Sequence, residues 1–276
     1  MHLDIVFPAH NEERRIGRTL TRYRRAVPDA DTRFVVALDG CSDRTAEIVR
    51  HHQTQDPRVR LLELPKLGKG GALAEALRGC DAPLVGFVDA DGATPPPELI
   101  RLARTVDEGA ADVAIASRRL PGSVTPAARS LSRRVTSAGF AGAIRRLFDL
   151  PHRDTQCGAK VLHQEAAGRI TPLLSSRDFL FDVDLLLAAR DLDLRVEEVP
   201  TIWVDQAGSK VDAVRDAQRM AVSALRLWFH HRVLPVEPTP APAAAVHDRH
   251  DAPGEVIDLV GHLHQDRRRD EHLVGA

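Results

Sequence analysis

The sequence of 276 residues has few cysteines and no long apolar run. Its three cysteines, Cys41, Cys80 and Cys157, are widely spaced and odd in number, which argues against a disulfide framework and favours a reduced protein. No Cys-x-x-Cys pair occurs, so a structural zinc site is not expected. No stretch approaches the roughly 18–20 apolar residues of a membrane-spanning helix, and the first residues, with the charged Asp4, lack the apolar core of a signal peptide. We therefore expect a cytoplasmic protein, whose membrane contact would be peripheral and on the inner face.

The chain also lacks an excess of charge of either sign. Lys+Arg 38 against Asp+Glu 39 gives a formal net charge of −1, so nucleic acid is not indicated as a partner. The apolar share of 43% is enough to bury a sizeable core. After Val233 the composition changes to LPVEPTPAPAAAVHDRHDAPGE, which has no hydrophobic periodicity. We predict a folded domain over 1–232 and a disordered, Pro/Ala-rich and charged tail over 233–276, whose histidines are exposed rather than metal ligands.

Short apolar runs alternate with helical patterns along the first half of the chain. The runs predict strands near 3–7, 34–38, 59–62, 84–88 and 112–116, with a helix between each pair. This alternation predicts an α/β fold with a mostly parallel sheet flanked by helices. In the second half we expect amphipathic helices near 128–147, 179–190 and 212–232, a loop at 153–160 and a strand-like segment at 194–203.

Two carboxylates follow the buried run LVGFV, at Asp89-Ala90-Asp91. Hard divalent cations take oxygen ligands and bridge phosphate oxygens, so this pair suits a cation that neutralises a diphosphate. The alternative is that Asp91-Gly92 makes a turn and Asp89 caps the next helix. For an isolated Asp-x-Asp the turn would be favoured by roughly three to one, because short motifs recur by chance. The neighbouring motifs favour the cation.

Polar clusters follow the first two predicted strands as well, at Pro8–Glu13 and Asp39–Asp43. With these segments the sequence resembles the family 2 glycosyltransferases. The resemblance implies a GT-A fold, a nucleotide-sugar donor and Mg²⁺ or Mn²⁺ on Asp89 and Asp91. It places these residues in the donor site: Pro8, Ala9, Asn11, Glu12, Asp39, Asp89, Ala90 and Asp91. Helix capping by Asn11 is a second interpretation, and both can hold together.

A glycine-rich segment, Leu67-Gly68-Lys69-Gly70-Gly71, precedes the third predicted helix. Its glycines would let the backbone approach a phosphate, and Lys69 would supply positive charge. A plain turn is the simpler interpretation of such a segment. The family resemblance adds weight to donor binding by Lys69, because a similar lysine-glycine element borders the donor site there.

A more specific resemblance is to the dolichyl-phosphate β-glucosyltransferases and related enzymes that make polyprenyl-phosphate sugars. It covers about residues 2–232 and rests on motifs in the expected order. These motifs are Asp89-Ala90-Asp91-Gly92-Ala93-Thr94, Ser117-Arg118-Arg119, Arg153-Asp154-Thr155-Gln156-Cys157-Gly158-Ala159-Lys160, Phe181-Asp182-Val183-Asp184-Leu185-Leu186 and Gly208-Ser209-Lys210. The resemblance implies an inverting, metal-dependent transfer of a hexose, glucose from UDP-glucose, onto a polyprenyl monophosphate.

A lipid phosphate is already a nucleophile, so it needs positioning rather than deprotonation. Arginines suit this task, because their forked donors match phosphate oxygens. The resemblance points to Arg118, Arg129 and Arg133 for the acceptor phosphate, and Arg129 and Arg133 are four residues apart on one helical face. An ordinary solvated basic face is the alternative. The apolar residues beside these arginines also suit an interfacial helix at a membrane surface.

Further polar residues are assigned by resemblance. Asp154 and Gln156 would orient the donor sugar or complete the metal environment. Asp182 and Asp184 would contact sugar hydroxyls or the acceptor. If the acceptor were an alcohol, a base would be required, and Asp184 is the first candidate. Two rival functions stay open: the same donor chemistry on a soluble acceptor, such as a phosphorylated small acid or a natural-product alcohol, and a non-catalytic nucleotide-sugar-binding module.

Overall fold

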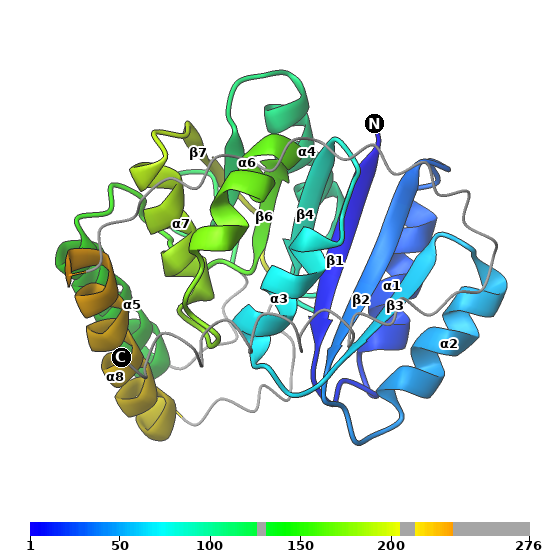
Figure 1. Ribbon diagram of the computed structural model, residues 1–276, viewed down its shortest axis with the longest axis horizontal. Coiled ribbons are helices and arrows are strands. Elements are labelled where there is room, and N and C mark those ends of the chain that lie inside the picture. Colours follow the sequence, from blue (N-terminus) through cyan, green and yellow to red (C-terminus); the bar gives the residue numbers. More distant parts are fainter. Residues whose placement is uncertain (126–130, 205–212, 234–276) are drawn as a thin grey trace, which may run out of the picture.

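The computed structural model describes residues 1–125, 131–204 and 213–233, with only the backbone course given for 131–138, 213–219 and 232–233. In these parts a single seven-stranded sheet carries helices on both faces (Figure 1). The strands are β1 (Leu3–Ala9), β2 (Thr32–Asp39), β3 (Val59–Leu64), β4 (Leu84–Val88), β5 (Val113–Ser117), β6 (Ala159–His163) and β7 (Val196–Pro200). The helices are α1 (Ile16–Ala26), α2 (Thr45–Gln55), α3 (Lys69–Arg78), α4 (Pro96–Asp107), α5 (Leu131–Phe148), α6 (Gln164–Ile170), α7 (Phe181–Asp191) and α8 (Ala213–Val233), with a 3-10 turn η1 (Thr171–Leu173) after α6.

The sheet has the order β3-β2-β1-β4-β6-β5-β7. β6 runs antiparallel to both of its neighbours, β4 and β5, while every other pairing is parallel. The predicted mostly parallel α/β sheet is thus confirmed. β6 and α6 were not predicted, since the predicted loop at 153–160 ends by entering β6 at Ala159.

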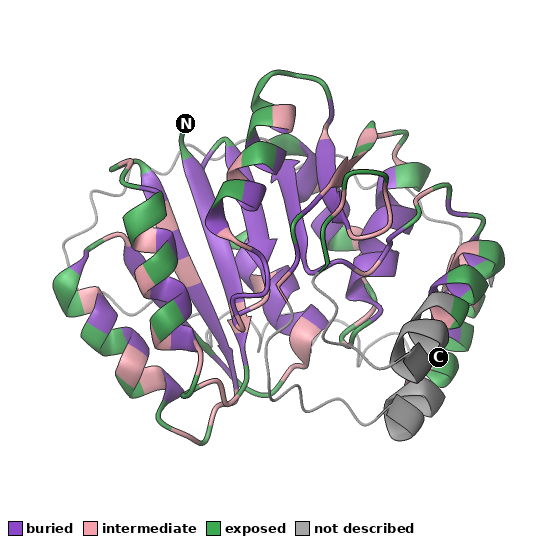
Figure 2. Ribbon diagram, turned by 180° about the vertical axis from the view of Figure 1, so that it is seen from behind, coloured by how far each residue is buried: buried purple, intermediate pink, exposed green. Residues whose placement is uncertain are grey.

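Two apolar cores lie on opposite faces of the sheet. One core packs α1, α2 and α4 against β1 and β2, and its residues are fully or almost fully buried. The other packs α3, α6 and α7, together with parts of α5 and α8. In Figure 2 the strands are buried between helices whose outer faces are exposed. Strands covered on both faces read as continuous apolar runs, and all five residues of β4 are indeed buried.

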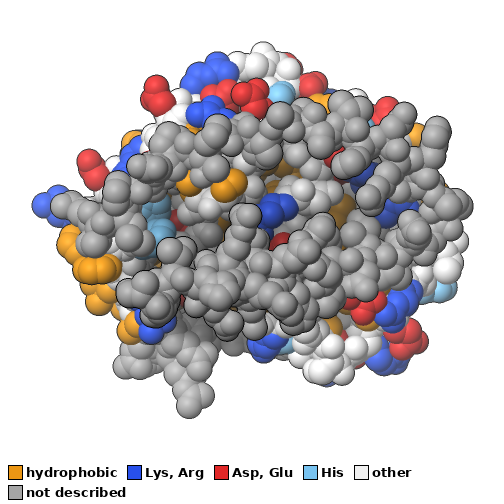
Figure 3. Space-filling view, viewed as in Figure 1, with side chains coloured by type: hydrophobic (Ala, Val, Ile, Leu, Met, Phe, Trp, Pro, Cys, Tyr) orange, Lys and Arg blue, Asp and Glu red, His pale blue; other side chains and the backbone are white. Residues whose placement is uncertain are grey.

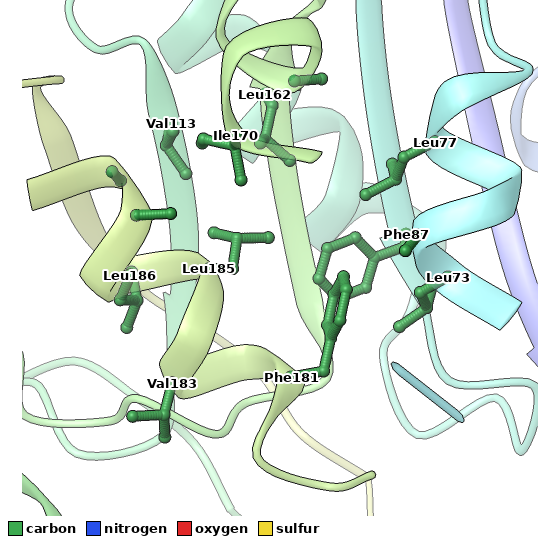
Figure 4. Close-up of a cluster of buried hydrophobic side chains, with 14 of the residues drawn as sticks. Leu73, Leu77, Phe87, Val113, Leu162, Ile170, Phe181, Val183, Leu185 and Leu186 are labelled. Carbon is green, nitrogen blue, oxygen red and sulfur yellow. The ribbon is translucent and has the colours of Figure 1, made fainter. Parts of the chain in front are cut away.

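An aromatic pair joins α7 to the sheet in the second core. Phe87 of β4 and Phe181 of α7 meet edge to face, with ring centroids 5.9 Å apart and planes at 72°. Leu73 and Leu77 of α3 lie beside them (Figure 4). This packing fixes the start of α7 next to the start of α3, so polar side chains from both helix ends can meet above β4.

The carboxyl ends of β1, β2, β4 and β5 lie at one edge of the sheet, the lower edge in Figure 1. In sheets of this kind ligands bind beyond that edge. No helix in residues 1–125, 131–204 and 213–233 is long and apolar enough to span a membrane. The boundary proposed at residue 232 falls one residue before the end of α8, and the predicted tail lies outside the described residues.

Candidate active site

The turn after β4 holds two carboxylates side by side at the carboxyl edge. The amide of Asp89 donates to the carbonyl of Gly158 (3.1 Å), which extends the pairing of β4 with β6 by one step. Asp91 Oδ1 accepts the amide of Ala93 (2.9 Å), and Gly92 takes φ +75°, a conformation that favours glycine. Backbone bonds therefore hold the turn before any ligand binds.

Gly158 leaves the space into which the Asp89 side chain extends. A Cβ at this position would lie 2.5 Å from Cγ and 3.0 Å from Oδ1 of Asp89, and closer still to Oδ2. Contacts under 3.0 Å essentially do not occur for real Cβ atoms. The glycine of the Arg153–Lys160 motif is thus required by the position of the Asp89 carboxylate, a role that the sequence alone did not reveal.

The two carboxylates leave an excess of negative charge at the turn. Burial and the nearby charge of Asp89 raise the pKa of Asp91 above its ordinary value. Such a pair suits a divalent cation, which removes the repulsion. Among the described residues no group of three or more His, Cys, Asp or Glu side chains gathers as a metal site. Asp89 and Asp91 could therefore hold a cation only together with ligands other than these two side chains.

Lys69 faces the same carboxylates. Its Nζ lies 2.7 Å from Asp89 Oδ1 and 3.9 Å from Asp182 Oδ2. Burial lowers the pKa of this ammonium group, but the charges of Asp89 and Asp182 outweigh burial and raise it, so Lys69 is charged. Lys69 thus lies beside the Asp-x-Asp turn, and its predicted contact with the donor stays a prediction.

The glycines around Lys69 serve a different purpose from the predicted one. Gly70 donates its amide to the carbonyl of Arg177 (3.0 Å), and a Cβ on Gly70 would lie 2.5 Å from the carbonyl oxygen of Ser176. Gly68, at φ +83°, also abuts the carbonyl of Arg177. The interpretation that these glycines admit a phosphate is corrected: they admit the loop before α7, which packs against the start of α3.

A buried lysine lies behind this cluster. Lys160 of β6 has no exposed surface, and its Nζ donates to Asp182 Oδ1 and to the carbonyl of Cys157 (3.0 Å), 5.6 Å from the ring centroid of Phe87. Sequence reasoning gave Lys160 no role, although a lysine inside the strand AKVLH must find a partner once it is buried. Asp182, considered for sugar hydroxyls, is 3% exposed and pairs with this lysine.

Asp39, at the end of β2, holds the segment that leads to Lys69. Its Oδ1 accepts the amides of Leu67 (2.5 Å) and Gly68 (3.0 Å). His10 Nδ1 lies 2.6 Å from the Asp39 carbonyl oxygen. Asp39 Oδ2 accepts no hydrogen bond from the part of the chain that the structure describes. This oxygen can therefore serve a ligand while Oδ1 fixes the loop.

The loops after β1 and β2 are cross-linked to each other. Asn11, at φ +56°, accepts the Ser42 amide on its Oδ1 (2.8 Å), and the Glu12 amide donates to Thr45 Oγ1 (2.8 Å). Because α1 begins only at Ile16, the N-cap interpretation of Asn11 is wrong.

The remaining predicted nucleoside-pocket residues lie at the same edge. Both Glu12 oxygens accept from Arg15 (2.5 Å each), an arginine that sequence reasoning missed. Pro8 and Ala9 end β1, and the carbonyl of Ala9 accepts from Cys41 Sγ (3.3 Å). The predicted residues are therefore together, but Asn11 and Glu12 make bonds that shape the loop.

Arg118 and Asp154 form a forked pair after β5. Nε and Nη2 of Arg118 lie 2.7 and 2.9 Å from the two oxygens of Asp154, and Nη2 also donates to the carbonyl of Gln156 (3.3 Å). The guanidinium stacks 5.0 Å from the ring centroid of Trp203. Burial would raise the pKa of Asp154, but Arg118 lowers it, so the carboxylate is charged. In this structure Asp154 fixes Arg118, and its predicted role in orienting the donor sugar or completing the metal environment stays a prediction.

Asp184 occupies a closed environment. It has no exposed surface, and Oδ2 accepts the amides of Ser175 and Ser176 (2.7 Å each), while Oδ1 lies 2.9 Å from His231 Nε2. Both oxygens are occupied, so the structure does not fit the predicted general base. Asp184 instead ties α8 to the loop that contacts the glycines around Lys69.

Two of the predicted acceptor arginines have no described side chain. Arg129 lies outside the described residues, and Arg133 lies on α5 within the part for which only the backbone course is given. The motif Gly208-Ser209-Lys210 and the histidines of the tail also lie outside the described residues. Their predicted roles stay predictions.

Comparison with known proteins gives a consistent result. The family model described as glycosyl transferase family 2 matches residues 4–171. Glycosyltransferase AglD of Haloferax volcanii is 32% identical over 240 residues, covering 85% of this chain and 38% of that protein. The dolichyl-phosphate beta-glucosyltransferase of Dictyostelium discoideum is 30% identical over 245 residues, covering 84% of this chain and 75% of that protein. The chain thus spans well under half of AglD but most of the second relative.

Solved structures show the same architecture. The glucosyl-3-phosphoglycerate synthase of Mycobacterium tuberculosis in complex with uridine diphosphate superposes with a TM-score of 0.61 and 18% identity, covering 82% of this chain and 79% of that one. The same enzyme with Mn²⁺, uridine diphosphate and phosphoglyceric acid gives a TM-score of 0.62 and 16% identity, covering 82% and 78%. At this identity the likeness concerns the fold, which is that of the GT-A glycosyltransferases.

Proposed function

The chain belongs to glycosyl transferase family 2, and from this premise we propose that it transfers glucose from UDP-glucose to a polyprenyl monophosphate with inversion at the anomeric carbon. Relatives that are named dolichyl-phosphate beta-glucosyltransferase support both the sugar and the lipid phosphate. The observation that carries the proposal is the pair of carboxylates of Asp89 and Asp91 on a backbone-held turn, with Lys69 beside them.

We propose that Asp89 and Asp91 bind Mg²⁺ or Mn²⁺. The raised pKa of Asp91 supports this assignment, because it reflects burial and the adjacent charge of Asp89, and a cation would neutralise that charge. A cation there supplies Lewis-acid stabilisation to a leaving diphosphate. Structures of the fold neighbour carry Mn²⁺ or Mg²⁺ together with uridine diphosphate, which supports the choice of metals.

The remaining donor contacts follow from the same edge of the sheet. Asp39 ends β2 next to Pro8 and Ala9 of β1, and its Oδ2, which accepts no hydrogen bond from the described residues, would contact the nucleoside there. Lys69 would contact the diphosphate. Gln156, whose carbonyl accepts from Arg118, would contact the sugar. These assignments define a donor path from β2 across β1 to β4.

A phosphate acceptor needs no base, which agrees with the buried and hydrogen-bonded state of Asp184, the candidate base. One phosphate oxygen attacks the anomeric carbon from the face opposite the diphosphate, a new C–O bond forms, and UDP departs with the electron pair of the broken bond. No proton is transferred, so this step does not require Asp184 as a base. Arg118, held by Asp154, would position the acceptor phosphate, together with Arg129 and Arg133.

We propose peripheral membrane contact through α8 for a lipid acceptor. Val222, Leu225 and Phe229 recur at helical spacing and are 51%, 62% and 61% exposed. Figure 3 shows apolar side chains gathered at the left edge of the molecule, over α5 and α8. An apolar helix stripe flanked by basic residues such as Arg226 suits the boundary between headgroups and acyl chains.

A soluble phosphorylated acid is the second candidate acceptor. It is favoured by the fold neighbours, whose structures contain phosphoglyceric acid. Both candidates carry a phosphate group that the arginines could hold, but a hydroxyl of the acid would have to lose its proton to a base, whereas the phosphate of the lipid needs none. The two differ in the product, which is soluble in organic solvent only for the lipid.

A panel of labelled donors against three acceptors tests the proposal. The donors are UDP-glucose, UDP-galactose, GDP-mannose and UDP-N-acetylglucosamine, and the acceptors are a polyprenyl phosphate, the matching polyprenol and 3-phosphoglycerate. We expect label from UDP-glucose in the organic phase with the polyprenyl phosphate only. Label that stays in water with 3-phosphoglycerate would select the second candidate, and transfer to the polyprenol would show that a base is present after all.

A further inference from the structure

Four charged side chains of alternating sign lead from the turn after β4 into the core. Lys69 Nζ lies 2.7 Å from Asp89 Oδ1 and 3.9 Å from Asp182 Oδ2, and the other oxygen of Asp182 accepts from Lys160. Lys69 therefore stands between two carboxylates, bound to one and within reach of the other.

The two ends of this row differ in their freedom to move. Lys160 is fully buried and bound to Asp182 and to the carbonyl of Cys157, with the Phe87 ring beside it. The side chains of Lys69 and Asp89 keep 21% and 27% of their surface exposed. Lys69 also has a longer and more flexible side chain than Asp89. It can change partner while the Asp182–Lys160 pair keeps its place.

Lys69 competes with any cation for Asp89. Its ammonium group lies at hydrogen-bond distance from Oδ1 of the carboxylate that would hold the cation, and two positive charges so close in a partly buried site repel each other strongly. We propose that Lys69 is a tethered counter-ion, which neutralises Asp89 while no cation is bound and moves to Asp182 when a cation arrives. This inference rests on the proposed metal role of Asp89.

The device has two consequences for the site. In the unloaded protein Lys69 keeps the Asp89 carboxylate in place against Gly158, so the ligand is positioned before the cation binds. After the exchange, Lys69 would no longer be bonded to Asp89. It would remain on the side of the site where the diphosphate arrives. Asp182 is then a positioning residue for Lys69, and Lys160 fixes Asp182.

Mn²⁺ binding without nucleotide tests the inference, measured from the loss of the electron paramagnetic resonance signal of free Mn²⁺. Lys69→Met removes the competing charge and keeps the side-chain length, so we expect Mn²⁺ to bind about tenfold more tightly. Lys69→Arg should bind Mn²⁺ like the wild type. Lys66→Met is the matched control, because it removes the same charge from a lysine whose Nζ faces His10. Melting curves show that each variant is folded, and Lys69→Gln replaces Lys69→Met if that variant is not.

A double-mutant cycle tests the part played by Asp182. If Asp182 receives Lys69, then removing Lys69 should raise Mn²⁺ affinity more in the Asp182→Asn background than in the wild type. Equal gains in both backgrounds would overturn this part. Unchanged Mn²⁺ affinity in Lys69→Met, or an equal gain in Lys66→Met, would overturn the counter-ion. If neither the wild type nor Lys69→Met binds Mn²⁺, the metal role of Asp89 falls, and the inference falls with it.

Discussion

Gly158→Ala is the sharpest perturbation of the site, because it adds one methyl group at the Asp89 carboxylate. The new Cβ would lie 2.5 Å from Asp89 Cγ. To reach ordinary van der Waals separation, Cγ would have to retreat by about 1 Å. Gly158 does not take a left-handed φ, so alanine can adopt its backbone conformation and the clash is the whole perturbation.

The clash should impair transfer much more than folding. A displacement of about 1 Å in a cation ligand is expected to lower kcat/KM by about 100-fold. Overpacking in a rigid core costs about 1–3 kcal/mol, but the Asp89 side chain is 27% exposed and can swing outward. We therefore expect a loss of unfolding free energy near the lower limit, about 1 kcal/mol.

The assay is label transfer to the acceptor, paired with urea unfolding followed by circular dichroism. Gly168→Ala is the matched control, because Gly168 lies in α6 and a Cβ there meets nothing within 4 Å. That variant should keep full activity and gain up to about 1 kcal/mol from helix propensity. Wild-type kcat/KM in Gly158→Ala would refute the reasoning, since Asp89 would then tolerate displacement.

Three further predictions concern the surroundings of the site. Asp154→Asn leaves the Arg118 guanidinium without its carboxylate, so urea unfolding should show a loss of about 3 kcal/mol. Burial lowers the pKa of His231, but the carboxylates of Asp184 and Asp191 beside it outweigh burial and raise the pKa above 6.5. The stability that His231 contributes is therefore full below pH 6.5 and is lost as the pH rises through the pKa of the folded state. His231→Gln should flatten this pH dependence of the unfolding free energy. The pair Leu225→Glu and Phe229→Glu should weaken sedimentation with anionic vesicles and leave the melting temperature within about 2 °C, since both side chains are more than 60% exposed.

Each of these predictions has a contradicting result. An unfolding free energy unchanged in Asp154→Asn would mean that Arg118 finds other partners at little cost. A stability of the wild type that rises between pH 6.5 and 8 relative to His231→Gln would give the opposite sign of linkage. Vesicle binding that survives both glutamate substitutions would place membrane contact on another surface.

Much of the fold could be predicted because strands that helices cover on both faces have unbroken apolar sequences. β4 is the plain example, with LVGFV buried at every position. β6 was missed because Lys160 interrupts its short apolar run. A lysine is expected to be exposed unless a buried partner such as Asp182 is known. Asp182 lies on α7, and sequence periodicity does not predict that this helix packs beside β6.

The site was predictable as a location and less so as a set of contacts. The rule that ligands bind beyond the carboxyl ends of parallel strands brings Asp39, Asp89 and Asp91 to one edge, and the structure has them there. The partners of Lys69 and of the glycines around it depend on the loop before α7, whose position is set by the packing of Phe87 on Phe181. Asp184 was misread for the same reason, because its bonding partners come from that loop and from α8.

The most direct test of the account is metal-dependent transfer of label from UDP-glucose to polyprenyl phosphate, by the wild type and by Asp91→Ala, each with Mn²⁺ and with EDTA. Organic-phase product is expected only for the wild type with Mn²⁺. Product formed at the wild-type rate by Asp91→Ala, or by the wild type in EDTA, would contradict it.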